Sequence, residues 1–241
     1  MNMEINKKLL PPQRPSYTDE ELERFSVNDL YRMKLTADET ARLRAINEKR
    51  SQERERKAAE WRKAEQPLVD ELRAAGFDVE SAWELFNRKE PWNKKERVKP
   101  YPEALLILLN HLERPYPDRV REGIARALAV GRAGWVAAGI DFRFAWEALV
   151  RLYHDEGVGT GTKDGLAVAI SLIAQENDEL LEEVIALAKD RLHGESRVLL
   201  LGALERSSDP RAKAALMELG TDPELKLEVQ AIYRRLERRK R

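Results

Sequence analysis

The chain has 241 residues, enough for one large or two small domains, and it carries 43 Lys and Arg side chains against 43 Asp and Glu. Apolar residues make up 42% of it, too many for a wholly disordered chain. The absence of cysteine excludes a disulfide scaffold, a thiolate metal site and a cysteine nucleophile. No apolar run reaches the ~18 residues that span a bilayer, and Met1 to Leu10 lacks the apolar stretch of a secretory signal. We therefore expect a cytoplasmic protein with no membrane contact.

Charge is spread unevenly along the sequence. Residues 100–233 carry 15 basic against 22 acidic side chains, a net charge of −7. A body of that charge repels polyphosphate at long range, so we expect it not to bind nucleic acid. The last eight residues hold six basic side chains and one acid, which suits a solvated helix end at the negative pole of the helix dipole. Contact of this tail with an acidic partner or RNA is the alternative.

Composition divides the chain into four predicted parts: an extended lead-in (1–18), a charged helical arm (19–66), a helical bridge (67–101) and a helical domain (102–241). Pro67 is expected to break or kink the helix that precedes it. Gly76 is expected to cap the end of the next one. The basic segment 88–100 contains Trp92, which we expect to plug the end of the core rather than to stack on a base.

Helix-capping residues mark three starts in the arm: Thr18, then Ser26 or Asn28, then Thr36 with Glu39 at the capping-box position. From residue 37 to 65 the chain contains no proline or glycine and only three large apolar residues, Leu43, Ile46 and Trp61. A helix with so thin an apolar stripe cannot be buried over its length. We expect an exposed arm or a helix laid across another copy of the chain, so self-association through the arm is possible.

Beyond residue 102 the sequence reads as helical hairpins, with helices expected at 103–113, 118–130, 142–154, 162–174, 179–191, 195–206, 210–219 and 223–238. An eight-residue pattern recurs in the second helix of successive pairs: a basic residue, an aliphatic one at the fourth place, alanine at the seventh and an aliphatic one at the eighth. It begins at Arg121, Lys163 and Arg197, with a degraded copy at Lys226. The aliphatic residues share one helix face, which only a stack of units can bury.

The basic residue of each copy lies near a helix start, where the macrodipole disfavours a cation. It therefore needs a partner, either an acid or a carbonyl in the turn between helices. Asp118, Asp164 and Glu195 are the nearest acids in sequence. Glycines at 131, 134 and 139 are expected to kink the stack.

These residues resemble the HEAT-repeat family. The segment from Asp118 to Ala125 looks like the second-helix signature of that family, and Asp209-Pro210 and Asp222-Pro223 are similar to its turn dipeptides. The resemblance covers about 102–238. It implies an all-α chain with a short α-solenoid of about four helical hairpins after the arm. The family consists mainly of protein-binding scaffolds.

Two segments could carry small-molecule chemistry, and both also have a structural explanation. The glycine-rich loop 157–163 could hold an anion, but its order is Gly-Thr-Lys, not that of a phosphate-binding loop, and Thr162 suits the cap of the next helix. The histidines His111, His154 and His193 occur at helix ends in different hairpins, without the spacing of a helical zinc site. We expect no catalytic residue, cofactor or metal ligand.

The sequence favours a non-enzymatic adaptor that binds a protein partner on the solenoid surface. The candidate partner surface comprises two charged groups on different predicted helices: Arg119, Glu122 and Arg126, and the acidic residues Asp178, Glu179, Glu182 and Glu183. The alternative is a HEAT-like alkylpurine DNA glycosylase, an enzyme whose aromatic and acidic residues could be supplied by Trp135, Trp146 and Asp141. The net charge of −7 provides no positive field for DNA, which argues against that alternative.

Overall fold

The computed structural model describes residues 15–87, 101–175 and 178–239, and every regular element within them is a helix. The all-α prediction is therefore confirmed. Most of the lead-in and the segment 88–100 with Trp92 lie outside the described residues. Among the helices that are described, none combines the length and apolar character needed to cross a membrane. The chain divides into two compact units, residues 1–60 and 61–241.

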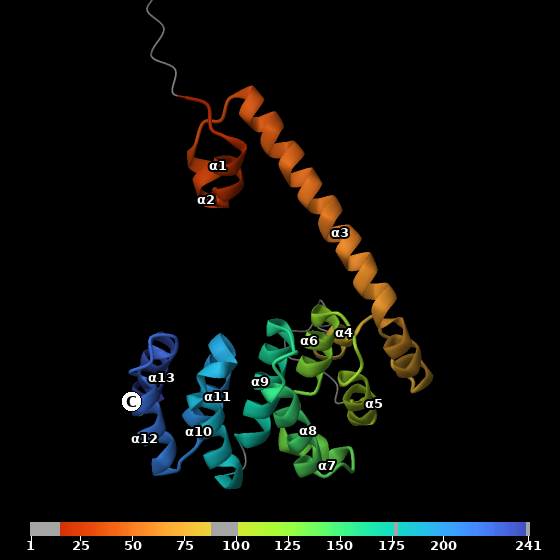
Figure 1. Cartoon of the computed structure of the whole chain (residues 1–241), viewed down its shortest axis with the longest axis vertical. Helices are drawn as coiled ribbons and strands as arrows, with labels where there is room; N and C mark the ends of the chain where they lie inside the picture. Colours follow the sequence, from red (N-terminus) through yellow and green to blue (C-terminus); the bar gives the residue numbers. More distant parts are fainter. Residues whose placement is uncertain (1–14, 88–100, 176–177, 240–241) are drawn as a thin grey trace, which may run out of the picture. The chain divides into compact units, whose positions relative to one another are not determined.

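The first unit contains α1 (Asp19–Arg24), α2 (Val27–Arg32) and the first part of α3 (Ala37–Ala74) (Figure 1). Each of the three helices begins with the reciprocal hydrogen bonds of a capping box. Thr18 and Thr36 were predicted as caps and Ser26 was one of two candidates, but the capping box itself was predicted only at Thr36. The capping pairs are Thr18 with Glu21, Ser26 with Asp29, and Thr36 with Glu39. The first unit is therefore a set of short helices whose starts the sequence specifies strongly.

Polar contacts attach the start of the chain to α3. The carboxylate of Glu39 is fully buried and accepts hydrogen bonds from the backbone N–H of Tyr17 at 2.9 Å and the hydroxyl of Ser16 at 3.3 Å. Arg42 donates to the carboxylate of Asp19 and to the carbonyl of Tyr17, both at 2.8 Å. Leu22 adds a buried apolar contact. By contrast, no side chain from residue 47 to 60 is buried, so this stretch of α3 is an exposed arm.

Of the break or kink predicted at Pro67, the break does not occur. Pro67 is exposed, so water can bond the carbonyl that loses its intrahelical partner, and α3 continues to Ala74. The helix ends as predicted at Gly76, which has φ 92°. The N–H of Gly76 donates to the carbonyl of Arg73, and the N–H of Phe77 donates to the carbonyl of Leu72. This pair of hydrogen bonds is a Schellman motif.

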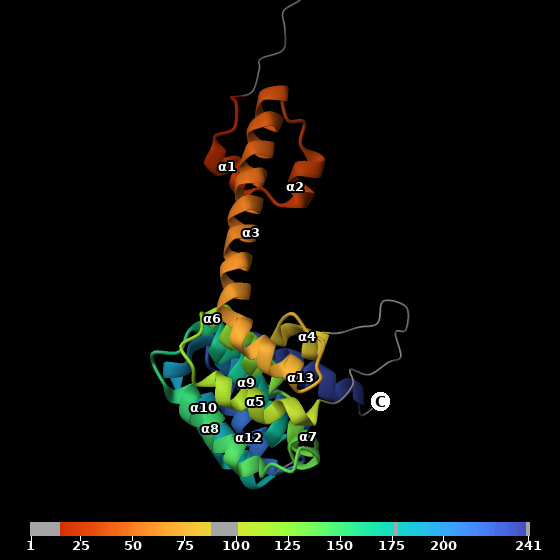
Figure 2. The ribbon, with the colours of Figure 1, turned by 90° about the vertical axis from the view of Figure 1, so that its right-hand side faces the viewer.

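The second unit consists of two rows of helices (Figures 1 and 2). The second-helix row is formed by α6 (Asp118–Ala127), α9 (Thr160–Ala174), α11 (Arg197–Arg206) and α13 (Lys226–Arg239). The first-helix row is formed by α5 (Pro102–Leu112), α8 (Phe142–His154), α10 (Leu181–Lys189) and α12 (Pro210–Leu219). Shorter elements connect or flank them: α4 (Ala82–Asn87), α7 (Gly131–Ala137) and the 3-10 helices η1 (Asp178–Leu180) and η2 (Arg191–Ser196).

The three copies of the eight-residue pattern lie on neighbouring helices. In the second-helix row, α6 packs against α9, α9 against α11 and α11 against α13. The fourth, seventh and eighth residues of the three copies are all buried in one continuous core that extends from Leu68 to Ile232. This stacking buries the apolar face that a single hairpin would leave exposed.

One helix was not predicted. Of the three glycines between α6 and α8, Gly131 begins α7 and Gly134 lies inside it, and this helix places Trp135 fully inside the core. Gly139 has φ 69° just beyond the end of this helix, a conformation that favours glycine. The glycine content lowers helix propensity in this stretch, and burial of the indole outweighs it.

Candidate partner-binding surface

The two charged groups predicted from the sequence do not form one site. Arg119, Glu122 and Arg126 lie on α6, in the second-helix row. The acidic residues from Asp178 to Glu183 lie on η1 and at the start of α10, in the first-helix row. Each group therefore has to be considered by its own contacts.

The group on α6 is a closed network. The guanidinium of Arg119 lies 3.7 Å from the ring centroid of Trp83 on α4, and the indole N–H of Trp83 donates to the Arg119 carbonyl at 3.3 Å. The carboxylate of Glu122 accepts hydrogen bonds from Arg119 and Arg126, both at 2.9 Å. A cation over an indole contributes about 0.5–1 kcal/mol at an exposed site. These contacts hold the helical bridge on α6, so the group has a structural role within the fold.

The acidic group links the first-helix row. Glu183 accepts a hydrogen bond from the indole N–H of Trp146 on α8 at 2.6 Å, and Glu182 binds Arg211 on α12 at 2.8 Å. Glu179 pairs with Arg143 on α8, and Asp178 accepts from the hydroxyl of Ser207 at 3.1 Å. Glu179 and Glu182 are about two-thirds exposed, with side-chain exposures of 68% and 66%. Exposed pairs of this kind contribute only about 0–1 kcal/mol, so a partner could replace them at little cost.

Two of the basic residues that open copies of the eight-residue pattern, Arg121 and Arg197, bond the end of the preceding helix. The guanidinium of Arg121 donates to the carbonyl of Leu112 at 3.1 Å, and that of Arg197 to the carbonyl of Ala188 at 3.3 Å. Both carbonyls lie nine residues earlier, at the C-terminal end of the first helix of the hairpin. Arg197 is fully buried and also binds Asp222, in the turn between α12 and α13, at 3.0 Å. The carbonyl partners of these two arginines lie at the ends of helices, not in the turn that was predicted, and an acid of the next hairpin is a further partner of Arg197.

Asp118 does not act as the hydrogen-bonding partner of Arg121, because its carboxylate caps α9. It accepts hydrogen bonds from the N–H groups of Gly161 and Thr162, each at 3.0 Å, and from the Thr162 hydroxyl at 2.6 Å. A Cβ on Gly159 would lie 2.3 Å from the same carboxylate, so only glycine leaves room for it. Burial disfavours the charged form, but the bonds from Thr162 and Gly161 outweigh it and lower the pKa of Asp118.

The predicted role of the glycine-rich loop therefore changes. Thr162 is not the cap, because α9 begins two residues earlier, at Thr160, and its N-cap is Gly159. The loop and helix start do bind an anion, but the anion is the carboxylate of Asp118 from the preceding hairpin. A phosphate would have to displace it.

The histidines divide into two environments. His111 is fully buried and its ring nitrogens contact the hydroxyl of Tyr116 and the carboxylate of Glu71, each at 2.7 Å. His154 and His193, 39 positions apart in sequence, come together with Asp190. Burial lowers the pKa of His193, with Asp190 opposing the shift and His154 adding to it. The sequence contains no spacing signal for this cluster, because its members come from two hairpins.

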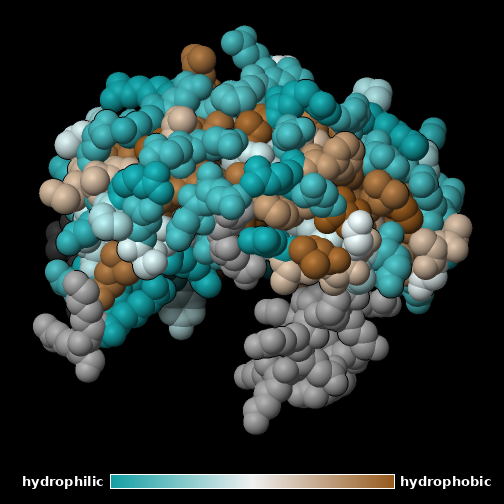
Figure 3. All heavy atoms as spheres, turned by 90° about the horizontal axis from the view of Figure 1, so that it is seen from below, coloured by the Kyte–Doolittle hydropathy of each residue, from teal (hydrophilic) through white to brown (hydrophobic). Residues whose placement is uncertain are grey.

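Much of the surface that Figure 3 shows, seen from below relative to Figure 1, is hydrophilic. Figure 3 shows one face, on which apolar residues occur in small groups among polar ones. A partner of that face would have to be recognised mainly through charge and hydrogen bonding.

Comparison with protein-family models, curated proteins and solved structures gives no match for this chain.

Proposed function

We propose that the second unit is a non-enzymatic protein-binding scaffold of the HEAT-like α-solenoid type. Two observations support the repeat architecture: the three pattern copies are buried on adjacent helices, and Arg121 and Arg197 make the same bond at the same nine-residue offset. Stacked hairpins expose a continuous face along their second helices, where solenoids bind extended partners. The exposed stretch 47–60 of α3 is where a second contact, or self-association, would form.

The observation that carries the proposal is a group of carboxylates at the start of α9, where a Cβ on Gly161 would lie 2.9 Å from both Oδ2 of Asp118 and Oε2 of Glu122. Burial raises the pKa of Asp164, and the negative charges of Glu122, Asp118 and Glu195 raise it further, while Arg126 partly offsets them. Those acids come from α6, α9 and η2, so they belong to neighbouring hairpins. A positively charged segment of a partner protein would relieve this repulsion. The partner surface of the proposal is therefore centred on Asp164 and Glu195, while Glu122 stays paired with Arg119 and Arg126.

The glycosylase alternative has less support. Trp135 is fully buried, and Trp146 is 3% exposed with its indole N–H on Glu183. Asp141 caps α8 by accepting the N–H of Arg143 at 2.9 Å. A base-processing site needs an accessible aromatic platform and phosphate neutralisation, and these residues offer neither.

Affinity purification with a charge-reversal pair tests the proposal. The wild-type chain should recover a basic protein in stoichiometric amount, and Asp164→Lys should reduce the recovery at least tenfold. Glu147→Lys is the matched control, because Glu147 is exposed on α8 in the first-helix row and undergoes the same charge change. If the partner is still recovered with Asp164→Lys but is lost with Glu147→Lys, the partner binds the first-helix row. A salt-sensitive shift of duplex DNA at physiological ionic strength would favour the glycosylase alternative.

A further inference from the structure

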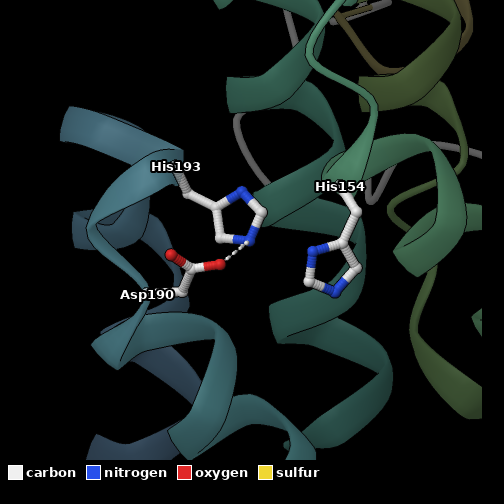
Figure 4. Close-up of side chains that lie close together, drawn as sticks. All are labelled: His154, Asp190 and His193. Atoms are coloured by element: carbon white, nitrogen blue, oxygen red, sulfur yellow. Dashed lines mark ion pairs between the residues drawn. The ribbon is translucent and has the colours of Figure 1, made fainter.

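Two imidazoles and a carboxylate converge beside the connection between α10 and α11. His154 is the last residue of α8, Asp190 is the C-cap of α10, and His193 lies in η2. One ligand atom from each of the three side chains lies within 4.8 Å of the other two. In Figure 4 the carboxylate and both rings are turned toward one another across the gap between the two hairpins.

The imidazole of His193 is buried without a hydrogen bond. Its side chain is 2% exposed, and neither ring nitrogen has a hydrogen-bond partner among the described residues. Oδ2 of Asp190 lies 3.5 Å from Nε2, within ion-pair distance but outside hydrogen-bonding geometry. Buried polar groups nearly always have a hydrogen-bond partner, so the unpaired ring nitrogens of His193 require an explanation, and a bound ion is one of the usual ones.

The surrounding contacts hold this ring in place. The ring of Tyr153 stacks on His193 with centroids 4.0 Å apart. The hydroxyl of Ser196 donates to the His193 carbonyl at 2.7 Å and lies 2.7 Å from the Tyr153 hydroxyl. Gly194 has φ 58°, a conformation that favours glycine and reverses the chain directly after His193. The histidine is therefore fixed in orientation before any ligand binds.

Asp190 is oriented in the same way. Its Oδ1 accepts the backbone N–H of Leu192 at 3.0 Å, which is the cap of η2. That bond leaves Oδ2 facing His193, as second-shell hydrogen bonds do for carboxylate ligands of metals. His154 is exposed and completes the group from the other hairpin.

We propose that His154, Asp190 and His193 bind a divalent transition-metal ion, with Zn²⁺ the best match, and that this ion ties the end of α8 to the α10–α11 connection. Two imidazoles and one carboxylate form a donor set that Zn²⁺ accepts, whereas Mg²⁺ and Ca²⁺ prefer oxygen ligands alone. Three protein ligands leave at least one position for water.

The geometry needs only a small adjustment. With bonds of 2.0–2.1 Å, the ligand atoms of a tetrahedral zinc ion are about 3.3 Å apart, so a separation of up to 4.8 Å must shorten. The exposed His154 can rotate inward while His193 and Asp190 stay in place. Lys163 and Arg197 lie near enough to act on His193 electrostatically, and Arg197 is already paired with Asp222.

Metal titration of the full chain, with any purification tag removed, tests the proposal. The chain has no cysteine and only three histidines, so few competing sites exist. Calorimetric titration with ZnCl₂ at pH 7.5 should show one ion bound with a Kd of about 10 µM or tighter, which corresponds to a binding free energy of about −6.8 kcal/mol. Co²⁺ should give the visible absorption of a four- or five-coordinate site. Saturating Zn²⁺ should also raise the melting temperature, because the ion binds only the folded chain.

Three variants distinguish this site from surface binding. His154→Ala and Asp190→Asn should each weaken Zn²⁺ affinity at least tenfold and abolish the cobalt bands, and both should still fold, because His154 is exposed and asparagine keeps the cap acceptor. His193→Ala removes a buried ring, so its fold is checked by circular dichroism before titration. Glu156→Gln is the control, since Glu156 is exposed two residues from His154 and outside the cluster. Wild-type affinity weaker than 100 µM, or unchanged affinity in His154→Ala and Asp190→Asn, would overturn the proposal.

Discussion

Asp118 belongs to α6 but caps α9, and this single side chain joins two hairpins. Helix N-termini leave backbone N–H groups without intrahelical partners, and a carboxylate is the best acceptor for them because it also opposes the positive pole of the helix dipole. Asp118 satisfies two such groups, on Gly161 and Thr162, and binds the Thr162 hydroxyl as well. In most helices the cap comes from the residue just before the helix, whereas here it comes from the preceding repeat.

Removing this cap should weaken the contact between the repeats. Asp118→Ala should lower the free energy of unfolding by about 1–3 kcal/mol, because three hydrogen bonds to a charged acceptor are lost. Urea titration followed by circular dichroism measures the change. Asp155→Ala is the matched control, since Asp155 accepts one N–H, from Gly157, in an exposed turn and should cost under about 1 kcal/mol. If both variants lose the same free energy of unfolding, the bonds that Asp118 makes between hairpins stabilise the fold no more than the bond of Asp155 within an exposed turn.

The same carboxylate predicts a dependence of stability on pH. The pKa of Asp118 in the folded chain is lower than the ordinary value of 3.8, because the bonds from Thr162 and Gly161 outweigh the effect of burial. A lowered pKa means that the stabilisation is fully present above the unfolded value and is lost as pH falls through the folded one. The difference in unfolding free energy between the wild type and Asp118→Asn should therefore be constant near pH 6 and shrink below about pH 4. Urea titrations between pH 6 and pH 3 measure it, and a difference independent of pH would contradict the assignment.

At the scale of elements, the two helical rows are held together by different contacts. In the second-helix row, small residues allow backbones to approach: a Cβ on Gly165 of α9 would lie 2.7 Å from the Cβ of Ala125 and 2.9 Å from the carbonyl of Glu122 on α6. In the first-helix row, charged pairs and hydrogen bonds such as Glu182 with Arg211 span the gap between neighbouring helices. The second-helix row is therefore intolerant of added volume, and the first-helix row depends more on ionic strength.

Two glycine substitutions separate packing from helix propensity. Replacing glycine by alanine inside a helix favours folding by about 0.8–1 kcal/mol where space allows. At Gly165 the new methyl group meets backbone and a buried methyl, so Gly165→Ala should be destabilising by about 1–3 kcal/mol despite that gain. At Gly202 the nearest atom is the Ser171 hydroxyl at 3.2 Å, and a hydroxyl can rotate, so Gly202→Ala should be neutral or stabilising. Chemical denaturation of both variants tests this, and a stable Gly165→Ala would show that α6 and α9 are not so closely packed in solution.

At the scale of the whole molecule, the sequence predicts what is encoded locally. Capping at Thr18 and Thr36 and the buried face of the three pattern copies follow from spacing within one helix, and the structure has them. Contacts between hairpins leave no such signal. The cap supplied by Asp118 and the meeting of His154 with His193 depend on how hairpins stack, which no local spacing records. The helix around Trp135 was missed for a related reason, because burial in the core overrides a glycine-rich sequence.

The extent of the second unit leads to a prediction about truncation. Its core begins before the hairpins, because Leu68 and Leu72 on α3 are fully buried and Glu65 accepts the N–H of Ala82 at 2.7 Å. A chain that starts at residue 61 keeps these contacts and should unfold cooperatively, at a melting temperature within a few degrees of the second-unit transition of the full chain. A chain that starts at residue 73 loses two buried leucines, each contributing about 2–5 kcal/mol, against a total stability of about 5–15 kcal/mol for a domain. It also loses the bond from Glu71 to the buried His111.

Circular dichroism melting and size-exclusion chromatography of both fragments should show that the fragment starting at residue 61 is folded and monodisperse and that the fragment starting at residue 73 is unfolded or aggregated. If the shorter fragment melts like the longer one, the C-terminal part of α3 is not part of this core, and the boundary of the folding unit belongs near residue 102.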